Sequence, residues 1–405
     1  MELNLLDKLD TRELGKELQA ARKKKGLTQE DAAKIIDAAR TTIIAVEKGE
    51  RRIRANELIK LARAYGRQVS DFVRSRPSVE PVQVQFRGPY KPTEADKETV
   101  SSAVDILEDL SRNYLELEKI TETPLTYKYP PGRDTSDQKA EVAAETAAIE
   151  ERLRLGLGDG PLPILRDLLE QEVGLRVFYL PIEPNQFSAI YFYDILLGGC
   201  IAVNSLHPEE RRRWSLAHDY GHFLAHRHKP AIFSEQSGQR LPNSEVFADY
   251  FALYFLMPTG GVKRRFYELQ RAQRKITPAD LCTLAHYYGV SVAAFTRRLE
   301  DLRLLPTGTW DKLRAGGFKV RQAQQQLGLG VIPAREEKLP IRYQYLAVDA
   351  FDRELISEGQ LAHFLQVDRL EARRIAEALR QQPGGETDNN SITLDLAQVL
   401  DVQEA

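Results

Sequence analysis

Two histidines one helical turn apart, followed at a distance by a glutamate, constrain this 405-residue chain more than any other feature. The histidines are His218 and His222, and the apolar residues around them recur at helical intervals. Since residues four apart share one face of a helix, both imidazoles are expected to point the same way. Glu245 opens a second helical pattern, in which Asp249 lies on the same face. Two histidines and one carboxylate are a ligand set for zinc, so the pattern predicts a metal site.

The residue that follows the first histidine determines whether such a metal site has a general base for hydrolysis. Zinc held by two neutral imidazoles and a carboxylate keeps a fourth position for water and lowers the pKa of that water to about 7. Asp219 is then the candidate general base. Its arm is one methylene, roughly 1.5 Å, shorter than that of the usual glutamate, and a misplacement of ~1 Å can cost ~100-fold in rate. Asp249 is expected to accept the free ring N–H of a liganding histidine and to fix its tautomer.

Around these residues, from about 140 to 260, the chain resembles the ImmA/IrrE family of metallopeptidases. The resemblance is carried by Leu155-Gly156-Leu157, Pro163-Ile164, Ile201-Ala202-Val203-Asn204, Phe251-Ala252 and Leu256-Met257-Pro258. It implies a zincin-like fold, His218, His222 and Glu245 as ligands of zinc, and position 219 as general base. Manganese is the alternative ion for this ligand set. Aspartate at 219 departs from the family's glutamate. Without these flanking segments, two histidines at this spacing are more often ordinary surface or core residues.

The N-terminal residues 11 to 74 show patterns for five short helices. Gly26 ends the first, Thr28 caps the second with Asp31 at the capping-box position, and Ser70 caps the fifth. The third runs from Arg40 to Lys48. The segments Leu27-Thr28-Gln29-Glu30, Arg40-Thr41-Thr42-Ile43 and Glu47-Lys48-Gly49-Glu50-Arg51 resemble the helix-turn-helix of the XRE/Cro/C1 repressor family. Asp37 stands where that family has its turn glycine.

The resemblance implies binding to double-stranded DNA, with the third helix in the major groove. Candidate contacts to base edges or adjacent phosphates are Gln29, Arg40, Thr41 and Thr42, and candidate phosphate contacts are Lys48, Arg51, Arg52 and Arg54. Residues 1 to 75 hold 17 Lys and Arg against 12 Asp and Glu, a net charge of +5, whereas the whole chain has −2. Positive charge is therefore concentrated where DNA would lie. A homodimer is expected, since such repressors bind two half-sites. The alternative to DNA binding is that the helix-turn-helix serves as a protein-docking module.

The remaining sequence predicts an α+β protein in four parts. Residues 1–75 are the all-α helix-turn-helix domain, and 76–136 are a linker with a long helix from Thr93 to Thr121. Residues 137–262 are the metallopeptidase domain with a small sheet, whose predicted strands are 175–180, 188–193 and 199–203. An edge of that sheet is expected to align an extended peptide. Residues 263–405 form a mostly helical region with helix-turn-helix-like pieces.

Apolar runs and cysteine content indicate in which cellular compartment the protein is expected. No apolar run approaches the ~20 residues of a membrane helix, and no signal peptide is recognised. Cys200 and Cys282 are the chain's only cysteines, so no disulfide framework is expected. These features predict a cytoplasmic protein that does not bind membranes.

Three functional hypotheses follow from this combination. The first is a DNA-binding transcriptional regulator whose zinc-dependent peptidase domain cleaves a helix-turn-helix repressor, or its own linker at 76 to 92, in a stress or mobile-element response. The second is a non-proteolytic regulator, or antitoxin-like protein, whose zinc fold senses a ligand or binds a partner, and Asp219 is its main support. The third is a peptidase that uses the N-terminal domain only to dock its substrate.

Overall fold

The protein is α+β, as the sequence predicts. The computed structural model describes residues 10–67, 69, 72, 85–87, 93–133, 138–183, 185–228, 231–234, 243–273, 275–330 and 338–381. Its contacts define two compact units. One comprises residues 1–116 and 124–340, and the other comprises 117–123 and 341–405. No described helix has the length and apolarity needed to span a membrane.

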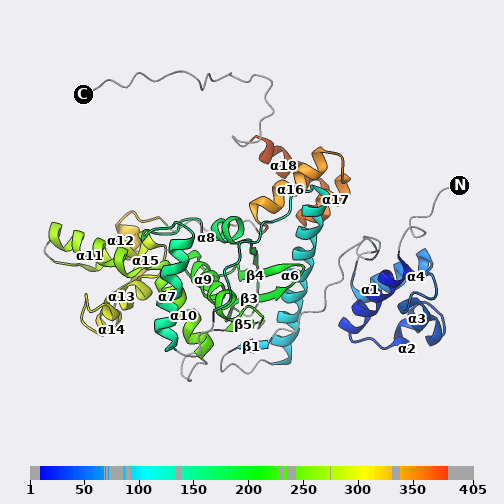
Figure 1. Ribbon diagram of the computed structural model, residues 1–405, viewed down its shortest axis with the longest axis horizontal. Coiled ribbons are helices and arrows are strands. Elements are labelled where there is room, and N and C mark those ends of the chain that lie inside the picture. Colours follow the sequence, from blue (N-terminus) through cyan, green and yellow to red (C-terminus); the bar gives the residue numbers. More distant parts are fainter. Residues whose placement is uncertain are drawn as a thin grey trace, which may run out of the picture. The chain divides into compact units, whose positions relative to one another are not determined.

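Four short helices form the N-terminal part of the first unit (Figure 1). They are α1 Thr11–Lys24, α2 Gln29–Ile35, α3 Arg40–Glu47 and α4 Ala55–Tyr65. Thr28 and Asp31 form the predicted capping box at the start of α2. Asp37 has φ 55°, so it adopts the left-handed backbone that the turn between α2 and α3 requires. The predicted fifth helix after Ser70 lies outside the described residues.

A five-stranded mixed sheet is the centre of the rest of the unit. Its strands are β1 Gln85–Arg87, β2 Arg176–Leu180, β3 Phe187–Asp194, β4 Gly198–Asn204 and β5 Ala231–Ser234, in the order β1-β5-β3-β4-β2. β3 runs antiparallel to β4 and β5, whereas β2 is parallel to β4 and β1 is parallel to β5. The three predicted strands are confirmed to within one residue at each end. The sheet extends further than expected, because β1 comes from the segment predicted as a linker and β5 was not predicted.

Alternation along β2 sends its side chains to opposite faces of the sheet. Val177 and Tyr179 belong to the core that contains the site helix. Phe178 faces the long helix α6, Glu94–Ile120, where the Tyr114 ring lies edge-on at 6.4 Å. The Tyr114 hydroxyl donates to Glu170 at 2.8 Å. Figure 1 accordingly shows α6 on one side of the strands and α9, α10 and α7 on the other.

α9 Glu209–His226 packs on β3 and β4, α10 Asn243–Leu256 packs on α9, and α7 Ala140–Arg154 packs on α10. Three further elements of this part are α8 Leu165–Leu168, the π-helical turn Leu169–Val173 and α11 Thr259–Gln273. α12 Pro278–Tyr288, α13 Val292–Asp301, α14 Thr309–Ala315 and α15 Val320–Gln326 follow. Gly260 and Gly261 lie in the first turn of α11, after the end of α10 at Leu256. A Cβ on Gly261 would lie 2.0 Å from the Asp159 carbonyl oxygen, so close backbone approach explains that glycine.

The second unit contains a small helical bundle after residue 340. It consists of α16 Ile341–Asp352, α17 Glu358–Leu365 and α18 Arg369–Arg380. Ser357 and Gln360 form a capping box on α17, and the Asp368 side chain caps α18. These helices agree with the mostly helical region predicted from residue 263 onward. Residues 382–405 lie outside the described part of the chain.

Candidate functional site

The two histidines lie on α9, where the sequence places them. Pro208 is the N-cap, and Glu209 and Glu210 occupy the first turn, where carboxylates interact favourably with the helix dipole. His218 is fully buried and His222 is 1% exposed. The helix packs on β3 and β4, so both imidazoles are held within the protein interior.

A glycine on α9 allows the second helix to come close. A Cβ on Gly221 would lie 3.1 Å from a ring carbon of Phe251 and 3.2 Å from the Cα of Ala248, both on α10. Contacts that short leave no space for a larger residue. Gly221 therefore lets the backbones of α9 and α10 approach beside the histidines, which brings Glu245 on the first turn of α10 within reach.

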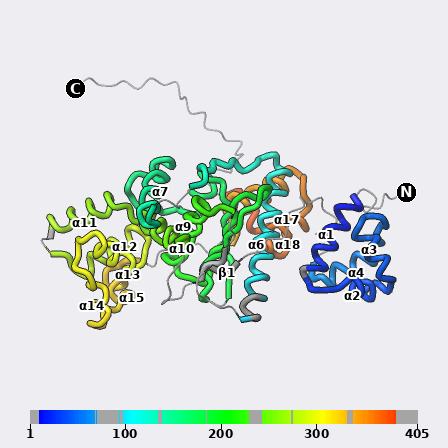
Figure 2. The backbone as a smooth tube through the Cα atoms, turned by 60° about the horizontal axis from the view of Figure 1, so that its bottom comes forward, coloured from blue at the N-terminus to red at the C-terminus, as the bar shows by residue number. Residues whose placement is uncertain are grey.

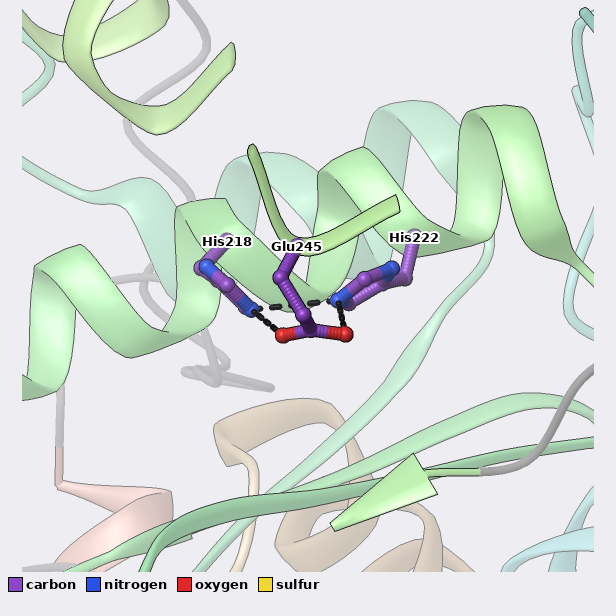
Figure 3. A group of neighbouring side chains, drawn as sticks. All are labelled: His218, His222 and Glu245. Carbon is purple, nitrogen blue, oxygen red and sulfur yellow. Dashed lines mark hydrogen bonds and ion pairs between the residues drawn. The ribbon is translucent and has the colours of Figure 1, made fainter. Parts of the chain in front are cut away.

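Three side chains converge on one point (Figure 3). The Nε2 atoms of His218 and His222 are 3.1 Å apart. The Glu245 carboxylate lies between the two rings, with one oxygen 3.4 Å from Nε2 of His218 and the other 3.3 Å from Nε2 of His222. Glu245 is 1% exposed. The three ligand atoms lie within 4.8 Å of one another, which is close enough to share one metal ion.

Asp249 fixes which ring nitrogen of His218 faces the group. Its Oδ1 lies 2.9 Å from Nδ1 of His218. A carboxylate accepts, so the hydrogen-bond network assigns the proton to Nδ1 and leaves the lone pair of Nε2 directed toward His222 and Glu245. Asp249 is one turn beyond Glu245 on α10, and its side chain is 34% exposed. The arrangement is that of a carboxylate positioned behind a metal-binding histidine.

The charges within the group favour a cation between the three side chains. Burial lowers the pKa of His218, but hydrogen bonds to Asp249 and Glu245 outweigh it and raise that pKa to about 10. Burial raises the pKa of Glu245, and its hydrogen bonds to His218 and His222 outweigh that effect and hold the pKa far below its usual value. A divalent ion satisfies the same negative carboxylates without protonating the imidazoles. The donor set therefore fits a metal ion.

The remaining polar residues of α9 face other surroundings. Asp219 is 1% exposed, and its negative charge contributes to the raised pKa of Tyr191 on β3, after the larger effect of burial. Asp219 is thus buried and near enough to Tyr191 for its charge to act on that hydroxyl. His226 ends α9 with its ring 5.6 Å from that of His222, and the exposed His228 contacts Tyr193. Neither His226 nor His228 belongs to the three-residue group.

A buried tyrosine on α9 forms a hydrogen bond to α7, and no local pattern in the sequence predicts this contact. Tyr220 donates a short hydrogen bond to Glu151, and Arg154 pairs with the same carboxylate. Burial and the Glu151 charge hold the pKa of Tyr220 well above its usual value. Because Tyr220 lies between His218 and His222 in sequence, this contact restrains the part of α9 that carries them.

The candidate DNA contacts are on α2, α3 and the loop after α3. Arg40 and Thr41 are exposed in the first turn of α3, and Thr42 is half-buried beside them. Gln29 begins α2, where its amide donates to Glu47 at 3.0 Å, and an Arg40 nitrogen lies 3.5 Å from the Gln29 carbonyl. The start of α3 therefore offers a cation and a hydroxyl to a groove.

The basic residues after α3 differ in their surroundings. Lys48, Arg52 and Arg54 are exposed. Arg51 forms an ion pair with Glu57 at 2.8 Å, and the same Glu57 carboxylate accepts from the backbone N–H of Arg54 at the N-terminus of α4. Arg51 therefore holds the loop against α4.

Comparison with known protein families gives a match for two segments of the chain. The IrrE N-terminal-like domain family matches residues 170–300, and the helix-turn-helix family matches residues 18–72. The chain therefore contains an XRE-type helix-turn-helix domain and an ImmA/IrrE-type peptidase domain, as the sequence predicts. Together they support a transcription regulator with a peptidase-like domain.

Matches to individual proteins add little. No curated protein matches this chain. Among solved structures, the chain is similar to "Crystal Structure of Bacillus thuringiensis PlcR in complex with the peptide PapR7 and DNA", at 11% identity over 91% of this chain and 94% of that chain. The TM-score is 0.16, too low to indicate a shared arrangement.

Proposed function

We propose that this protein is a DNA-binding transcription regulator whose peptidase domain is zinc-dependent and cleaves a helix-turn-helix repressor-type protein or the chain itself. The observation that carries the proposal is the buried convergence of His218, His222 and Glu245. The helix-turn-helix and IrrE-type family matches support the two halves of the proposal.

Each side chain at the centre has a distinct role in this proposal. His218 and His222 supply neutral imidazole nitrogens, and Glu245 supplies a carboxylate oxygen. Asp249 orients His218 and keeps the proton on Nδ1. Bound zinc supplies a Lewis acid and acidifies a water molecule, and manganese is the alternative ion. The interior position of all three ligands excludes bulk water, which strengthens their electrostatic interactions.

Asp219 is the proposed general base. A carboxylate beside His218 accepts a proton from the attacking water and later passes it to the leaving amine. The buried position of Asp219 beside the sheet suits that role, because a desolvated carboxylate is a stronger base. Its short arm attenuates the reaction, so Asp219→Glu is expected to raise peptidase activity, by up to ~100-fold if the missing methylene misplaces the base by ~1 Å.

Self-cleavage is one form of the proposal that the chain itself can test. β1 places residues 85–87 in the sheet, where backbone hydrogen bonds to β5 must be released before a peptidase can bind them. Cutting is therefore expected on either side of β1 within 76–92. The zinc-loaded full chain is incubated alone and beside Asp219→Glu and His218→Ala, and its products are read by mass spectrometry.

A fragment of roughly 8 to 10 kDa, about the weight of the first domain, supports self-cleavage if His218→Ala lacks it. A separate helix-turn-helix substrate is tested by adding a tagged residue 1–92 segment of this chain to each of the three proteins. Intact chains and intact segment in all three, including Asp219→Glu, would refute the proteolytic half of the proposal.

DNA binding is proposed to use the start of α3 and the loop after it. Arg40, Thr41, Thr42 and Gln29 are the proposed groove contacts, and Lys48, Arg51 and Arg52 are the proposed phosphate contacts. Two copies are proposed to bind adjacent half-sites. Duplexes selected from a randomised pool are titrated at several salt concentrations. Lys48→Gln is expected to reduce the salt slope by about one and Arg40→Gln to relax sequence preference; unchanged binding in both variants would refute this face.

A non-proteolytic regulator is the second candidate, and Asp219 is the observation that favours it. In that case the metal centre holds a ligand or a partner and cleaves nothing. The two candidates separate on Asp219→Glu, because a gain of activity indicates an attenuated peptidase, and sequence-specific DNA binding without activity in either form indicates a regulator alone.

A further inference from the structure

A cavity of about 910 Å³ lies beside the candidate metal centre. Its walls come from α9, α10, α13, α14 and α15. Figure 2 shows α13, α14 and α15 grouped together. The volume is within the range of pockets that enclose drug-sized ligands. Asp249 lines it, but its described lining includes none of His218, His222 and Glu245. The cavity therefore lies on the side of His218 that carries Nδ1, with Asp249 between them. The Nε2 atom of His218 faces Glu245 instead.

Three aromatic side chains contribute to its wall, beside aliphatic residues such as Val246, Leu253 and Val292. Trp214 comes from α9, Tyr250 from α10 and Trp310 from α14. All three are half-buried, so each shows part of its ring to the cavity. The two tryptophans are the only ones in the chain. Half-exposed aromatic rings bind apolar groups and leave polar edges for hydrogen bonds.

Charges of both signs surround this apolar wall. Arg297 on α13 and Arg321 on α15 are exposed at the cavity, and within the described residues neither has a hydrogen bond or ion pair. Glu210 on α9 and Asp301 on α13 contribute negative charge to the same lining. Arg211 is already bonded to Ser188. Both carboxylates also interact electrostatically with buried arginines, Glu210 with Arg213 and Asp301 with Arg298, whereas Arg297 and Arg321 have no such partner among the described residues.

We propose that this cavity binds a short peptide with apolar side chains and free ends. Arg297 and Arg321 receive its carboxylate, Glu210 and Asp301 receive its ammonium group, and the tryptophans receive its side chains. Such a ligand neutralises both sets of charges, which a simple organic acid or amine does not. Trp310 and Arg321 lie beyond residue 300, where the IrrE-type match ends, so part of the cavity is built outside the matched domain. The proposal does not rest on peptidase activity.

The test uses the full chain after metal removal by a chelator, so that no peptide is cleaved. The tripeptide Val-Phe-Leu is titrated while tryptophan emission is followed, beside its N-acetyl form and its C-terminal amide. Saturable binding of the free peptide is expected without metal, with about tenfold or greater weakening when either end is blocked, the range for loss of one charged hydrogen bond.

Variants assign the binding to this cavity. Arg297→Gln and Arg321→Gln are each expected to weaken binding about tenfold. Arg271→Gln is the matched control, because Arg271 is an exposed arginine on α11 that does not line the cavity. Trp310→Phe is expected to remove part of the emission change while calorimetry still detects the peptide.

Three results would overturn the proposal: equal binding of all three peptides, equal binding by Arg297→Gln, Arg321→Gln and wild type, or binding that requires metal. The last would place the peptide on the metal centre. Binding by the metal-free chain together with no cleavage by the zinc-loaded chain would support the cavity and refute the proposed peptidase.

Discussion

Removal of the Asp249 carboxylate tests whether the group behind His218 belongs to a metal site. Asp249→Ala deletes the acceptor that lies 2.9 Å from Nδ1 of His218. The imidazole then loses both its fixed tautomer and a negative charge that increases its basicity. Loss of such a partner costs about 10- to 100-fold in metal affinity, which is about 1.4–2.8 kcal/mol. Asp249→Asn is expected to fall between wild type and alanine, since an amide oxygen accepts the same hydrogen bond without charge.

The assay is competition for zinc against a chromophoric chelator at neutral pH. The Asp249 side chain is 34% exposed, so its truncation leaves no sealed cavity and the fold is expected to survive. Asp311→Ala is the matched control, because Asp311 is an exposed aspartate in the first turn of α14. Equal zinc affinity in wild type, Asp249→Ala and Asp311→Ala would refute the role given to this hydrogen bond.

Three further substitutions probe the structure around the functional parts. Burial raises the pKa of Glu47, but its hydrogen bonds, above all those from Arg22, outweigh burial and lower that pKa. The Arg22–Glu47 ion pair therefore stabilises the packing of α1 and α3 at pH values above the pKa of glutamate in the unfolded chain, near 4.3. This stabilisation is lost as the pH falls. Hydrogen exchange in the full chain should therefore show α1 and α3 loosening in acid, and Glu47→Gln should cost about 3–5 kcal/mol at neutral pH and reduce that pH dependence. Gly221→Ala forces a Cβ to 3.1 Å from Phe251, so Tm should fall by the equivalent of about 1–3 kcal/mol and zinc should bind more weakly; an unchanged Tm and affinity would contradict the close packing. Asp37→Gly should stabilise the helix-turn-helix by about 1 kcal/mol, because φ is 55° there, and faster exchange in α2 would count against it.

Local signals in the sequence were enough for much of the fold. The capping box of Thr28 and Asp31 and the left-handed Asp37 depend on neighbouring residues, so their patterns predicted them directly. The alternating strands near residues 176 and 200 were equally legible. His218 and His222 could be placed on one face because helical spacing is fixed by backbone geometry.

Other features depend on contacts between distant segments. β1 and β5 are short, and they are strands because β5 pairs with β3 and β1 pairs with β5, so neither carries a periodic signal of its own. Gly261 in α11 allows close approach to the backbone of Asp159, which lies about a hundred residues earlier. The Tyr220 contact to Glu151 has the same origin. Tertiary packing outweighs local propensity in each case.

The candidate site likewise combines residues that the sequence predicts with features that depend on contacts between distant segments. The sequence selected the three predicted ligands and Asp249, and the structure brings these four side chains together. Their role as a metal site remains a prediction. The cavity beside Asp249 was not foreseen, because its walls combine α9 and α10 with helices up to α15. No pattern within one helix indicates which face of another it will meet.

The zinc content of the purified chain, measured beside His218→Ala and Glu245→Ala, tests the proposed metal centre most directly. Elemental analysis after reconstitution and dialysis is expected to give about one zinc per chain, the number that one open three-ligand site holds. Both variants should lose it while keeping wild-type helix content by circular dichroism. A wild-type chain that retains no metal, or folded variants that retain as much as wild type, would contradict the assignment of His218, His222 and Glu245 as ligands.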